Sequence, residues 1–226
     1  MGYSDREHGL SASGPEFFRE ANVRYVVGIA GPAGGGKTSL VRRLVMEMED
    51  ATAIHIDSYQ RITREPIRKI VQWMERGADF GEFAIPLLPD HLEKLRLGQA
   101  VVDPVSMVEI PARKYIIFET HFGRAHQATG RHIDLLVWLD TPLDVALARN
   151  LKDLIRPLLQ EHGAEPGRDK LAWLVGYLEN YLADVRRLVL MQKSRVGADA
   201  DLVVDGSGDL ALIVEKVRRE ILTRLP

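Results

Sequence analysis

The chain has 226 residues, of which 46% are hydrophobic and 27% are charged, and its formal net charge is -2. A chain of this size can bury a substantial core, but it lacks the overall basic excess that nucleic-acid binding favours. It contains no cysteine, which excludes disulfides and thiolate chemistry, and no apolar run near the ~20 residues that cross a bilayer. We therefore expect a cytoplasmic protein without nucleic-acid or membrane partners, and its composition is compatible with a homo-oligomer.

Short apolar runs alternate with helical patterns along the chain. Apolar, β-branched runs predict strands over 24–30, 51–56, 114–119, 133–140 and 201–204. Helical spacing predicts helices over 37–49, 67–76, 86–97, 143–159, 169–192 and 210–225, and Gly98 is a C-cap signal for the third of these. This alternation predicts right-handed crossovers and a mostly parallel central sheet of about five strands with helices on both faces. We expect one α/β domain over residues 1–226.

A glycine-rich loop follows the first predicted strand and opens the first predicted helix. Its sequence, GPAGGGKT, begins at Gly31 and fits the pattern G-x-x-x-x-G-K-[ST]. Such a loop turns successive backbone N–H groups toward phosphate oxygens, and the helix directs its positive end at the same anion. We predict a P-loop NTPase fold, a three-layer α/β/α sandwich. The predicted nucleotide-binding residues are Gly31, Ala33, Gly34, Gly35, Gly36, Lys37, Thr38 and Ser39.

The loop predicts ATP with Mg²⁺, because Lys37 can hold the β- and γ-phosphates and the Thr38 hydroxyl can bind the ion. It does not say whether the nucleotide is transferred, hydrolysed or sensed. No N-K-x-D motif for guanine recognition is present, and the size and charge fit a kinase of small molecules best. Two alternatives remain open: a regulatory ATP-binding switch without an acceptor, and a nucleotide hydrolase. Acceptor-dependent release of ADP distinguishes the kinase from both.

Polar residues follow the other predicted strands at the edge where parallel sheets bind ligands. Asp57 could accept the proton of an incoming hydroxyl or bind Mg²⁺, and it could equally cap a turn. Glu119 is expected beside Mg²⁺, while a single histidine such as His121 is more often a structural residue. After Asp140 we interpret Thr141 as the cap of the next helix.

Several segments, in order from about residue 24 to 206, resemble the uridine kinase group of P-loop kinases. They are the loop GPAGGGKTS with the following IDSYQR, and the stretches LRLGQAVVDPV, IIFETH, LLVWLDTPLDVALAR and ADADLVVDG. The resemblance implies an ATP-dependent transfer of phosphate to an alcohol. It also implies a helical acceptor-site insertion over residues 62–97 and a lid over residues 149–168.

The resemblance also implies residue roles. Asp57 would be the catalytic base, Lys37 would hold the phosphates, and Thr38, Asp57 and Glu119 would surround Mg²⁺. The lid would place cations over the phosphates, with catalytic candidates Arg149 and Lys152, and Arg156 on the same helix. The acceptor would meet Asp57, Tyr59, Arg61, Asp79, Phe80 and His121, whereas Phe83 is expected to anchor the loop to the core.

The chain departs from the group's pattern mainly where the acceptor is recognised. Gln60 replaces a tyrosine, and Thr120 replaces a glycine after the strand-end glutamate. Ser106, Met107 and Val108 replace an aromatic-Asp-Phe segment. The departures leave the phosphate-transfer residues in place. The expected acceptor is therefore a nucleoside, a sugar or a vitamin-like alcohol.

Overall fold

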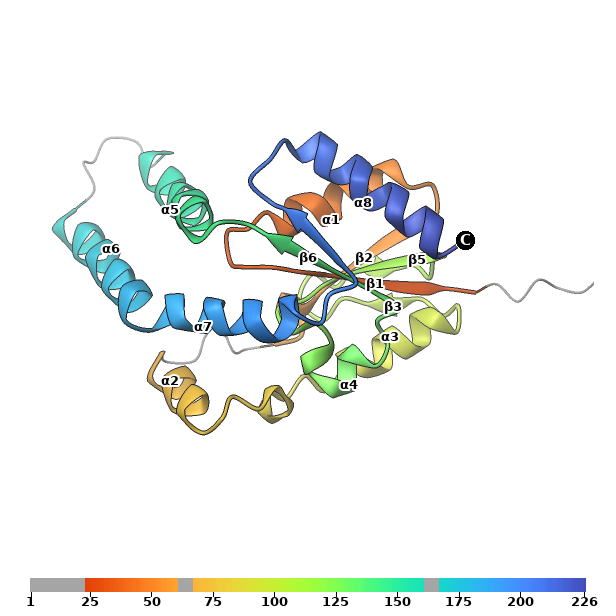
Figure 1. Ribbon diagram of the computed structural model, residues 1–226, viewed down its shortest axis with the longest axis horizontal. Coiled ribbons are helices and arrows are strands. Elements are labelled where there is room, and N and C mark those ends of the chain that lie inside the picture. The colour runs from red at the N-terminus through yellow and green to blue at the C-terminus, as the bar shows by residue number, and fades with distance from the viewer. Residues whose placement is uncertain (1–22, 61–66, 161–166) are drawn as a thin grey trace, which may run out of the picture.

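The computed structural model describes residues 23–60, 67–160 and 167–226. Within them, five strands form a parallel sheet in the order β2-β5-β1-β6-β7 (Figure 1). The strands are β1 (Tyr25–Ala30), β2 (Ala51–His55), β5 (Tyr115–Glu119), β6 (Leu135–Asp140) and β7 (Leu202–Asp205). Each of them coincides with a predicted strand to within two residues at either end. The predicted parallel sheet is confirmed.

Helices cover both faces of this sheet, as Figure 1 shows: α1 and α8 lie on one face, and α3 and α4 on the other. The helices α5, α6 and α7 form an arm that extends beyond one end of the sheet. The three-layer α/β/α architecture of a P-loop NTPase is thus confirmed. The described helices are α1 (Lys37–Glu47), α2 (Ile67–Glu75), α3 (Leu88–Arg96), α4 (Gln127–Gly130), α5 (Leu143–Gln160), α6 (Arg168–Asn180), α7 (Arg186–Gln192) and α8 (Leu210–Arg224).

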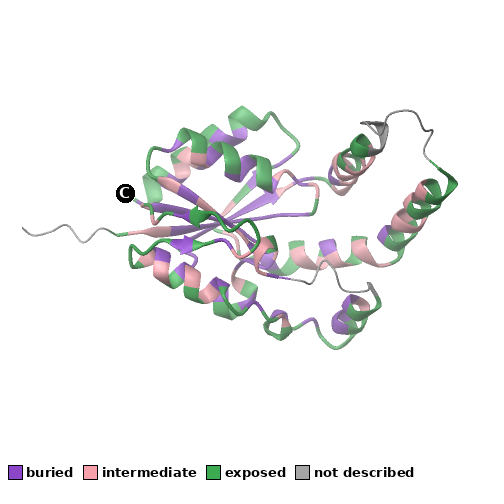
Figure 2. Cartoon of the chain, turned by 180° about the vertical axis from the view of Figure 1, so that it is seen from behind, coloured by how far each residue is buried: buried purple, intermediate pink, exposed green. Residues whose placement is uncertain are grey.

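Alternate residues of the strands feed two separate core layers. On β1, Val27 and Ile29 face the layer that holds α1 and α8, whereas Val26 and Ala30 face the layer that holds α2 and α3. This is the period of two that a strand imposes on its side chains. Figure 2 shows the result, with buried residues concentrated along the central strands. The sheet is therefore a rigid base for the residues at its carboxyl edge.

Two details differ from the prediction. An antiparallel ladder of β3 (Val101–Val102) and β4 (Glu109–Ile110) was not predicted, because two-residue strands are too short to show a period. The predicted helix over 169–192 contains a wider, π-type turn at Tyr181–Val185 and ends in another at Lys193–Gly197. Such turns add a residue to the helical repeat, which hydrophobic spacing alone does not reveal.

The predicted stop signal of α3 is confirmed: Gly98 follows the C-cap residue Leu97 and ends the helix in a left-handed conformation. Gly98 has a φ of 84°, and the N–H of Gln99 donates to the carbonyl of Lys94 at 2.9 Å. Residues 161–166 of the predicted lid and 62–66 of the predicted insertion lie outside the described residues. No helix in the described ranges is both long and apolar enough to cross a membrane.

Candidate functional site

The loop between β1 and α1 adopts a conformation that demands glycine at several positions. Gly34 has a φ of 73°, and a Cβ there would lie 2.2 Å from the carbonyl oxygen of Ala146. A Cβ at Gly31 would lie 2.7 Å from the carbonyl oxygen of Leu139. Gly36, with a φ of 96°, caps the start of α1. Gly31 and Gly34 have no room for a Cβ, and Gly34 and Gly36 take a positive φ that favours glycine. This conformation lets the backbone N–H groups at the start of α1 face a phosphate.

Lys37 is the buried cation of this loop. Its Nζ donates to the carbonyls of Gly31 and Pro32, each at 3.0 Å. Burial lowers the pKa of Lys37, although the charges of Glu119 and Asp57 oppose that shift. The ammonium group is therefore held across the loop and close enough to both carboxylates to interact with them.

A hydrogen-bonded chain runs from α1 across the sheet edge. The Thr38 hydroxyl donates to Glu119 Oε1 at 2.8 Å, and His55 Nδ1 lies 2.5 Å from Glu119 Oε2. Burial raises the pKa of Glu119, but the hydrogen bonds from His55 and Thr38 and the charge of Lys37 outweigh it, so its pKa lies below the ordinary value. The hydrogen bond to Glu119 raises the pKa of His55. Glu119 is thus an ionised, buried carboxylate beside the phosphate loop.

Asp57 lies in a 3-10 turn, Ile56–Ser58, directly after β2. One carboxylate oxygen, Oδ1, is 3.0 Å from His121 Nε2 and accepts a hydrogen bond from Gln60 Nε2 at 2.7 Å. The hydrogen bond from His121 lowers the pKa of Asp57 to about 2, and Gln60 and Lys37 contribute to the shift although burial opposes it. The side chain remains 61% exposed. At neutral pH it presents a negative charge to solvent at the sheet edge.

The hydroxyl oxygen of Thr38 and the nearby carboxylate oxygens are suitable ligands for a magnesium ion that is bound together with a nucleotide. Carboxylate and hydroxyl oxygens are the ligands that Mg²⁺ prefers, and it takes only one or two from the protein alongside phosphates and water. The Thr38 hydroxyl donates its hydrogen to Glu119 and so keeps its lone pairs for a cation. Within the described part of the chain, no three acidic, histidine or cysteine side chains form a metal cage of their own.

A small cavity of about 150 Å³ lies on the side of the phosphate loop that faces the ends of β6 and β7. It is lined by Gly36, Ser39 and Arg149, and by Gly206 and Gly208 from the turn after β7. Arg149 Nη1 donates to the carbonyl of Gly206 at 2.9 Å, so its guanidinium group is held beside the loop rather than over an open face. Lys152, one turn further along α5, is exposed.

Thr141 holds this part of the site together in a way that the sequence did not indicate. Its buried hydroxyl donates to the carbonyl of Gly35 at 2.9 Å. The predicted role as a helix cap therefore misses its contact with the phosphate loop. Because Thr141 follows β6, this bond ties the end of that strand to the loop.

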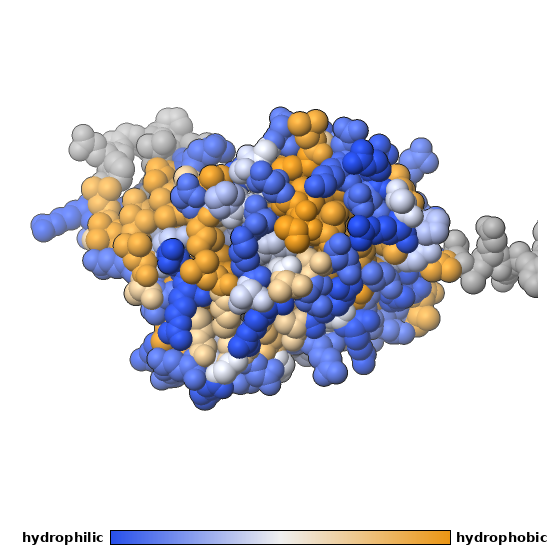
Figure 3. Space-filling model, in the orientation of Figure 1, coloured by the Kyte–Doolittle hydropathy of each residue, from blue (hydrophilic) through white to orange (hydrophobic). Residues whose placement is uncertain are grey.

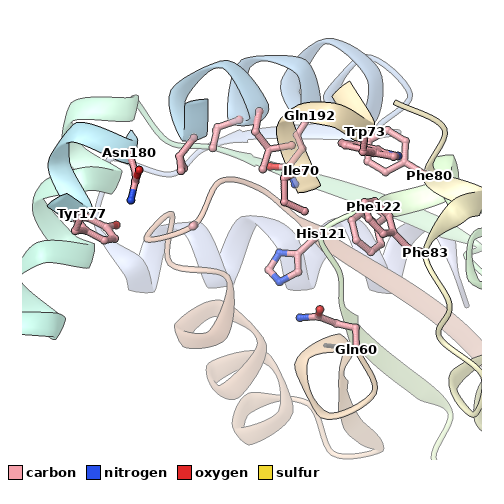
Figure 4. A pocket seen from close by; sticks show the side chains of 14 residues that line it. Gln60, Ile70, Trp73, Phe80, Phe83, His121, Phe122, Tyr177, Asn180 and Gln192 are labelled. Carbon is pink, nitrogen blue, oxygen red and sulfur yellow. The ribbon is translucent and has the colours of Figure 1, made fainter. Parts of the chain in front are cut away.

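A second, larger cavity of about 350 Å³ opens next to Asp57. Figure 4 shows Gln60 and His121 on the side of the phosphate loop, with the rings of Phe83 and Phe122 at one end and Tyr177 and Asn180 at the other. The wall opposite comes from α2 and from the α6–α7 segment. The cavity thus lies between the residues that could handle phosphate and α2 of the predicted acceptor-site insertion, together with the α6–α7 segment, for which no acceptor role was predicted.

The predicted acceptor residues do not all reach this cavity. Phe80 and His121 line it, and so does Phe83, which was expected only to anchor the loop. Asp79 instead caps its own turn, because its Oδ1 accepts from the N–H of Gly81 at 2.8 Å. The Tyr59 hydroxyl lies 2.9 Å from His91 Nδ1 and is not among the lining side chains. Arg61 lies outside the described residues.

Sequence reasoning missed several residues of the site. His55 could have been found, because it precedes Asp57 by two residues and faces Glu119 in the parallel register of β2 and β5. Gln60 was noted only as a departure, yet it contacts Asp57 and lines the larger cavity. Trp73, Tyr177 and other residues from α2 and α6 carry no local signal, because only the packing of distant segments brings them to the cavity.

Comparison with known proteins agrees with the motifs. No protein-family model matches the chain. A uridine kinase of Halobacterium salinarum is 25% identical over 215 residues, covering 87% of this chain and 88% of that protein. A uridine kinase of Chloroflexus aggregans is 25% identical over 205 residues, covering 85% of this chain and 91% of that protein.

Among solved structures, a shikimate kinase of Acinetobacter baumannii in complex with shikimate matches with a TM-score of 0.49 at 17% identity. The match covers 89% of this chain and 95% of that one. The sequence relatives, rather than this structural match, carry the family resemblance. Over most of its length, the chain resembles the uridine kinase group of P-loop kinases.

Proposed function

We propose that this protein is a kinase that transfers the γ-phosphate of ATP to a hydroxyl group of a small molecule. One observation supports this most strongly: the ionised Asp57 interacts with Lys37 of the phosphate loop and is hydrogen-bonded to His121 and Gln60, which line a cavity large enough for a small ligand. A nucleotide switch needs the loop but not the cavity. The similarity to uridine kinases, which spans both halves of the site, points in the same direction.

In this proposal the nucleotide lies along the glycine loop. Its phosphates would meet the backbone N–H groups at the start of α1 and the ammonium group of Lys37. Its base would reach the smaller cavity, between Arg149 and the turn that contains Gly206 and Gly208. Arg149 would then lie next to the nucleotide, on the side of the loop that faces Gly206. Lys152 remains the candidate for a lid cation.

Mg²⁺ would be held near Thr38 and Glu119, and when bound it would neutralise charge on the β- and γ-phosphates. His55 would keep Glu119 oriented through its hydrogen bond. This leaves Thr38 and Glu119 in the arrangement that the structure has already formed, so little reorganisation is needed when the nucleotide binds.

Asp57 would accept a hydrogen bond from the acceptor hydroxyl and aim its oxygen at the γ-phosphate. A carboxylate with a pKa of about 2 is a weak base. Phosphoryl transfer, however, passes through a loose transition state in which positioning and charge stabilisation matter more than early proton removal. The proton would pass to Asp57 as the new oxygen–phosphorus bond forms and the bond between the γ-phosphorus and the β–γ bridging oxygen breaks, which releases ADP. His121 and Gln60 would fix the carboxylate for this role.

The test is acceptor-dependent release of ADP from Mg·ATP with a panel of alcohols. We expect Asp57→Asn to keep ATP binding, as measured by calorimetry, and to lower turnover by about 10²–10⁴-fold, the usual contribution of a positioned acid or base. Retained turnover in that variant would remove Asp57 from the reaction. ATP binding without any acceptor-dependent turnover would favour the regulatory switch, and phosphate release without an acceptor would favour a hydrolase.

A further inference from the structure

The larger cavity has an apolar wall on the side away from the phosphate loop. Trp73, Phe80, Phe83 and Phe122 form a continuous aromatic cluster, in which the rings of Phe83 and Phe122 stack with centroids 5.2 Å apart and an interplanar angle of 14°. The indole N–H of Trp73 already donates to the carbonyl of Asp79 at 2.8 Å. Trp73, Phe80 and Phe122 are almost fully buried and Phe83 is half-buried, so a ligand would meet the uncovered parts of these rings and no free ring donor.

The helices on the other side of the cavity also contribute apolar side chains. Ile70 from α2 and Val185, Leu188 and Val189 from the α6–α7 segment are among the lining residues. The π-type turn at Tyr181–Val185 lies in this segment, where such turns often mark a functional site. Aliphatic side chains thus face the aromatic ones across the cavity.

Polar groups are few and mostly already paired. Among the described residues that line the cavity there is no aspartate, glutamate, lysine or arginine. The Tyr177 hydroxyl accepts a hydrogen bond from Asn150 Nδ2 at 2.8 Å, and the Gln60 amide donates to Asp57. Asn180 and Gln192 are the further polar side chains on the wall. Among the described lining residues no charged side chain can pair with an anionic group, and on this wall only the neutral groups of Tyr177, Asn180 and Gln192 can bond a further hydroxyl.

Tyr177 and Asn180 place neutral polar groups at one end of the cavity, and the ionised carboxylate lies on the side of the phosphate loop. Asp57, His121 and Gln60 meet there, as Figure 4 shows for the latter two side chains. A ligand that matches this distribution has a hydroxyl near Asp57, a largely apolar body and few further polar groups. Ring faces bind flat aromatic groups through stacking as well as burial.

We propose that the acceptor is an uncharged alcohol with an aromatic body and few polar substituents, rather than a ribonucleoside or a charged sugar. This inference rests on the proposed function for its reaction but on the cavity alone for its ligand. An anionic molecule would lose its hydration there without a cationic partner among the described lining residues, and a polyhydroxylated one would find few groups for its hydroxyls. Of the residues replaced relative to the resemblance, Gln60 lines the cavity, in agreement with a changed ligand, whereas Ser106, Met107 and Val108 do not line it.

Binding and transfer are tested separately, with the full chain. Ligand-observed NMR in the absence of ATP compares naphthylmethanol, uridine and pantothenate as an aromatic, a nucleoside and an anionic alcohol. We expect naphthylmethanol to bind about ten- to a hundredfold more tightly than the other two, the range that an apolar pocket can discriminate. Equal or tighter binding of uridine or pantothenate would overturn the inference.

Substitutions in the cavity wall test whether the ligand binds there. Leu188→Gln puts an amide into the half-buried wall and should weaken naphthylmethanol binding about tenfold. Val185→Asn tests the same wall independently if the first variant loses stability. Leu182→Gln is the matched control, because Leu182 is 72% exposed and does not line the cavity. This variant should bind naphthylmethanol as tightly as the native protein does. Unchanged affinity in both wall variants would contradict the proposed site.

ADP release with the same alcohols separates this inference from the proposed function. Tight binding of naphthylmethanol with acceptor-dependent ADP release supports both. Tight, wall-dependent binding without any ADP release would contradict the kinase reaction while supporting the ligand class. ADP release that depends on uridine and not on naphthylmethanol would support the kinase and overturn the ligand class.

Discussion

The two sides of the site are built in opposite ways. The phosphate side is a continuous stretch of backbone, from Gly31 to Thr38, whose glycines are required by close approaches to Leu139 and Ala146. The proposed acceptor side is assembled from side chains of α2, the turn around Phe80, the end of β5 and the α6–α7 segment. On this proposal, phosphate binding constrains a short local sequence, whereas the choice of acceptor is distributed over the fold and can change without disturbing the loop.

The largest expected effect is on the phosphate side. Replacing Lys37 with alanine removes the buried cation that contacts the loop, and we expect ATP-dependent turnover to fall by about 10³-fold or more, as for the loss of a group that stabilises transferring charge. The measurement is ADP release at saturating acceptor. Arg42→Ala, an exposed position on the same helix, should leave turnover unchanged. Substantial turnover in the Lys37 variant would mean that the loop does not carry the phosphates.

A pair of glycine substitutions tests whether the conformation of the phosphate loop requires glycine. Gly34→Ala would place a Cβ 2.2 Å from a carbonyl oxygen at a positive φ, so we expect it to lower the free energy of unfolding by about 1–3 kcal/mol and to weaken ATP binding. Gly176→Ala adds a methyl group in open space within α6 and should stabilise the helix by about 0.5–1 kcal/mol. Chemical denaturation measures both. Equal effects at the two positions would contradict the required loop conformation.

The same contrast explains what the sequence could reveal. The strands, the loop and the strand-end acids Asp57 and Glu119 follow from local patterns, and the sheet topology brings them together as parallel strands must. The contacts of His121 and Thr141 depend on the register between strands and on how β6 meets the loop. The aromatic wall depends on packing between segments about a hundred residues apart, such as Trp73 and Leu188, which no local pattern encodes.

The Asp57–His121 contact joins the two sides, and its loss should have a smaller effect. His121→Ala removes the main hydrogen bond that lowers the pKa of Asp57, so this pKa should rise from about 2 toward 3.8. A carboxylate whose pKa is lowered by folding stabilises the native state above its unfolded pKa, and that contribution is lost as the pH falls through the folded value. The variant should therefore be less stable than the native protein above about pH 3.8, and this difference should close as the pH falls toward about 2.

Carbon NMR titration of the aspartate carboxyl groups measures this shift directly. We also expect turnover of the His121 variant to fall about tenfold, because a loosely held carboxylate orients the hydroxyl less well. His91→Ala is the control, since His91 contacts Tyr59 and not Asp57. An unchanged Asp57 pKa in the His121 variant would show that the contact is not what holds the carboxylate ionised.

The smallest effect is expected at His55. Its pKa is raised by the hydrogen bond to Glu119, so the pair stabilises the protein fully below the ordinary histidine value of 6.5 and loses this contribution as the pH rises through the raised pKa. Because the ring is 38% exposed, solvent screening reduces the effect. Thermal unfolding should give His55→Gln a Tm about 2 °C below the native protein near pH ~6, with the gap closing near pH ~9. A gap that grows with pH would have the wrong sign for this pair.

The central claim is that the glycine loop and Lys37 hold the phosphates of a nucleotide next to Asp57. Calorimetric titration of the folded protein with Mg·ATP tests it most directly, in the native chain and in Lys37→Ala and Asp57→Asn. We predict saturable binding in the native chain, retained binding in the Asp57 variant and severely weakened binding in the Lys37 variant. Absence of Mg·ATP binding to the folded native protein, or equal binding with and without the Lys37 ammonium group, would contradict the account.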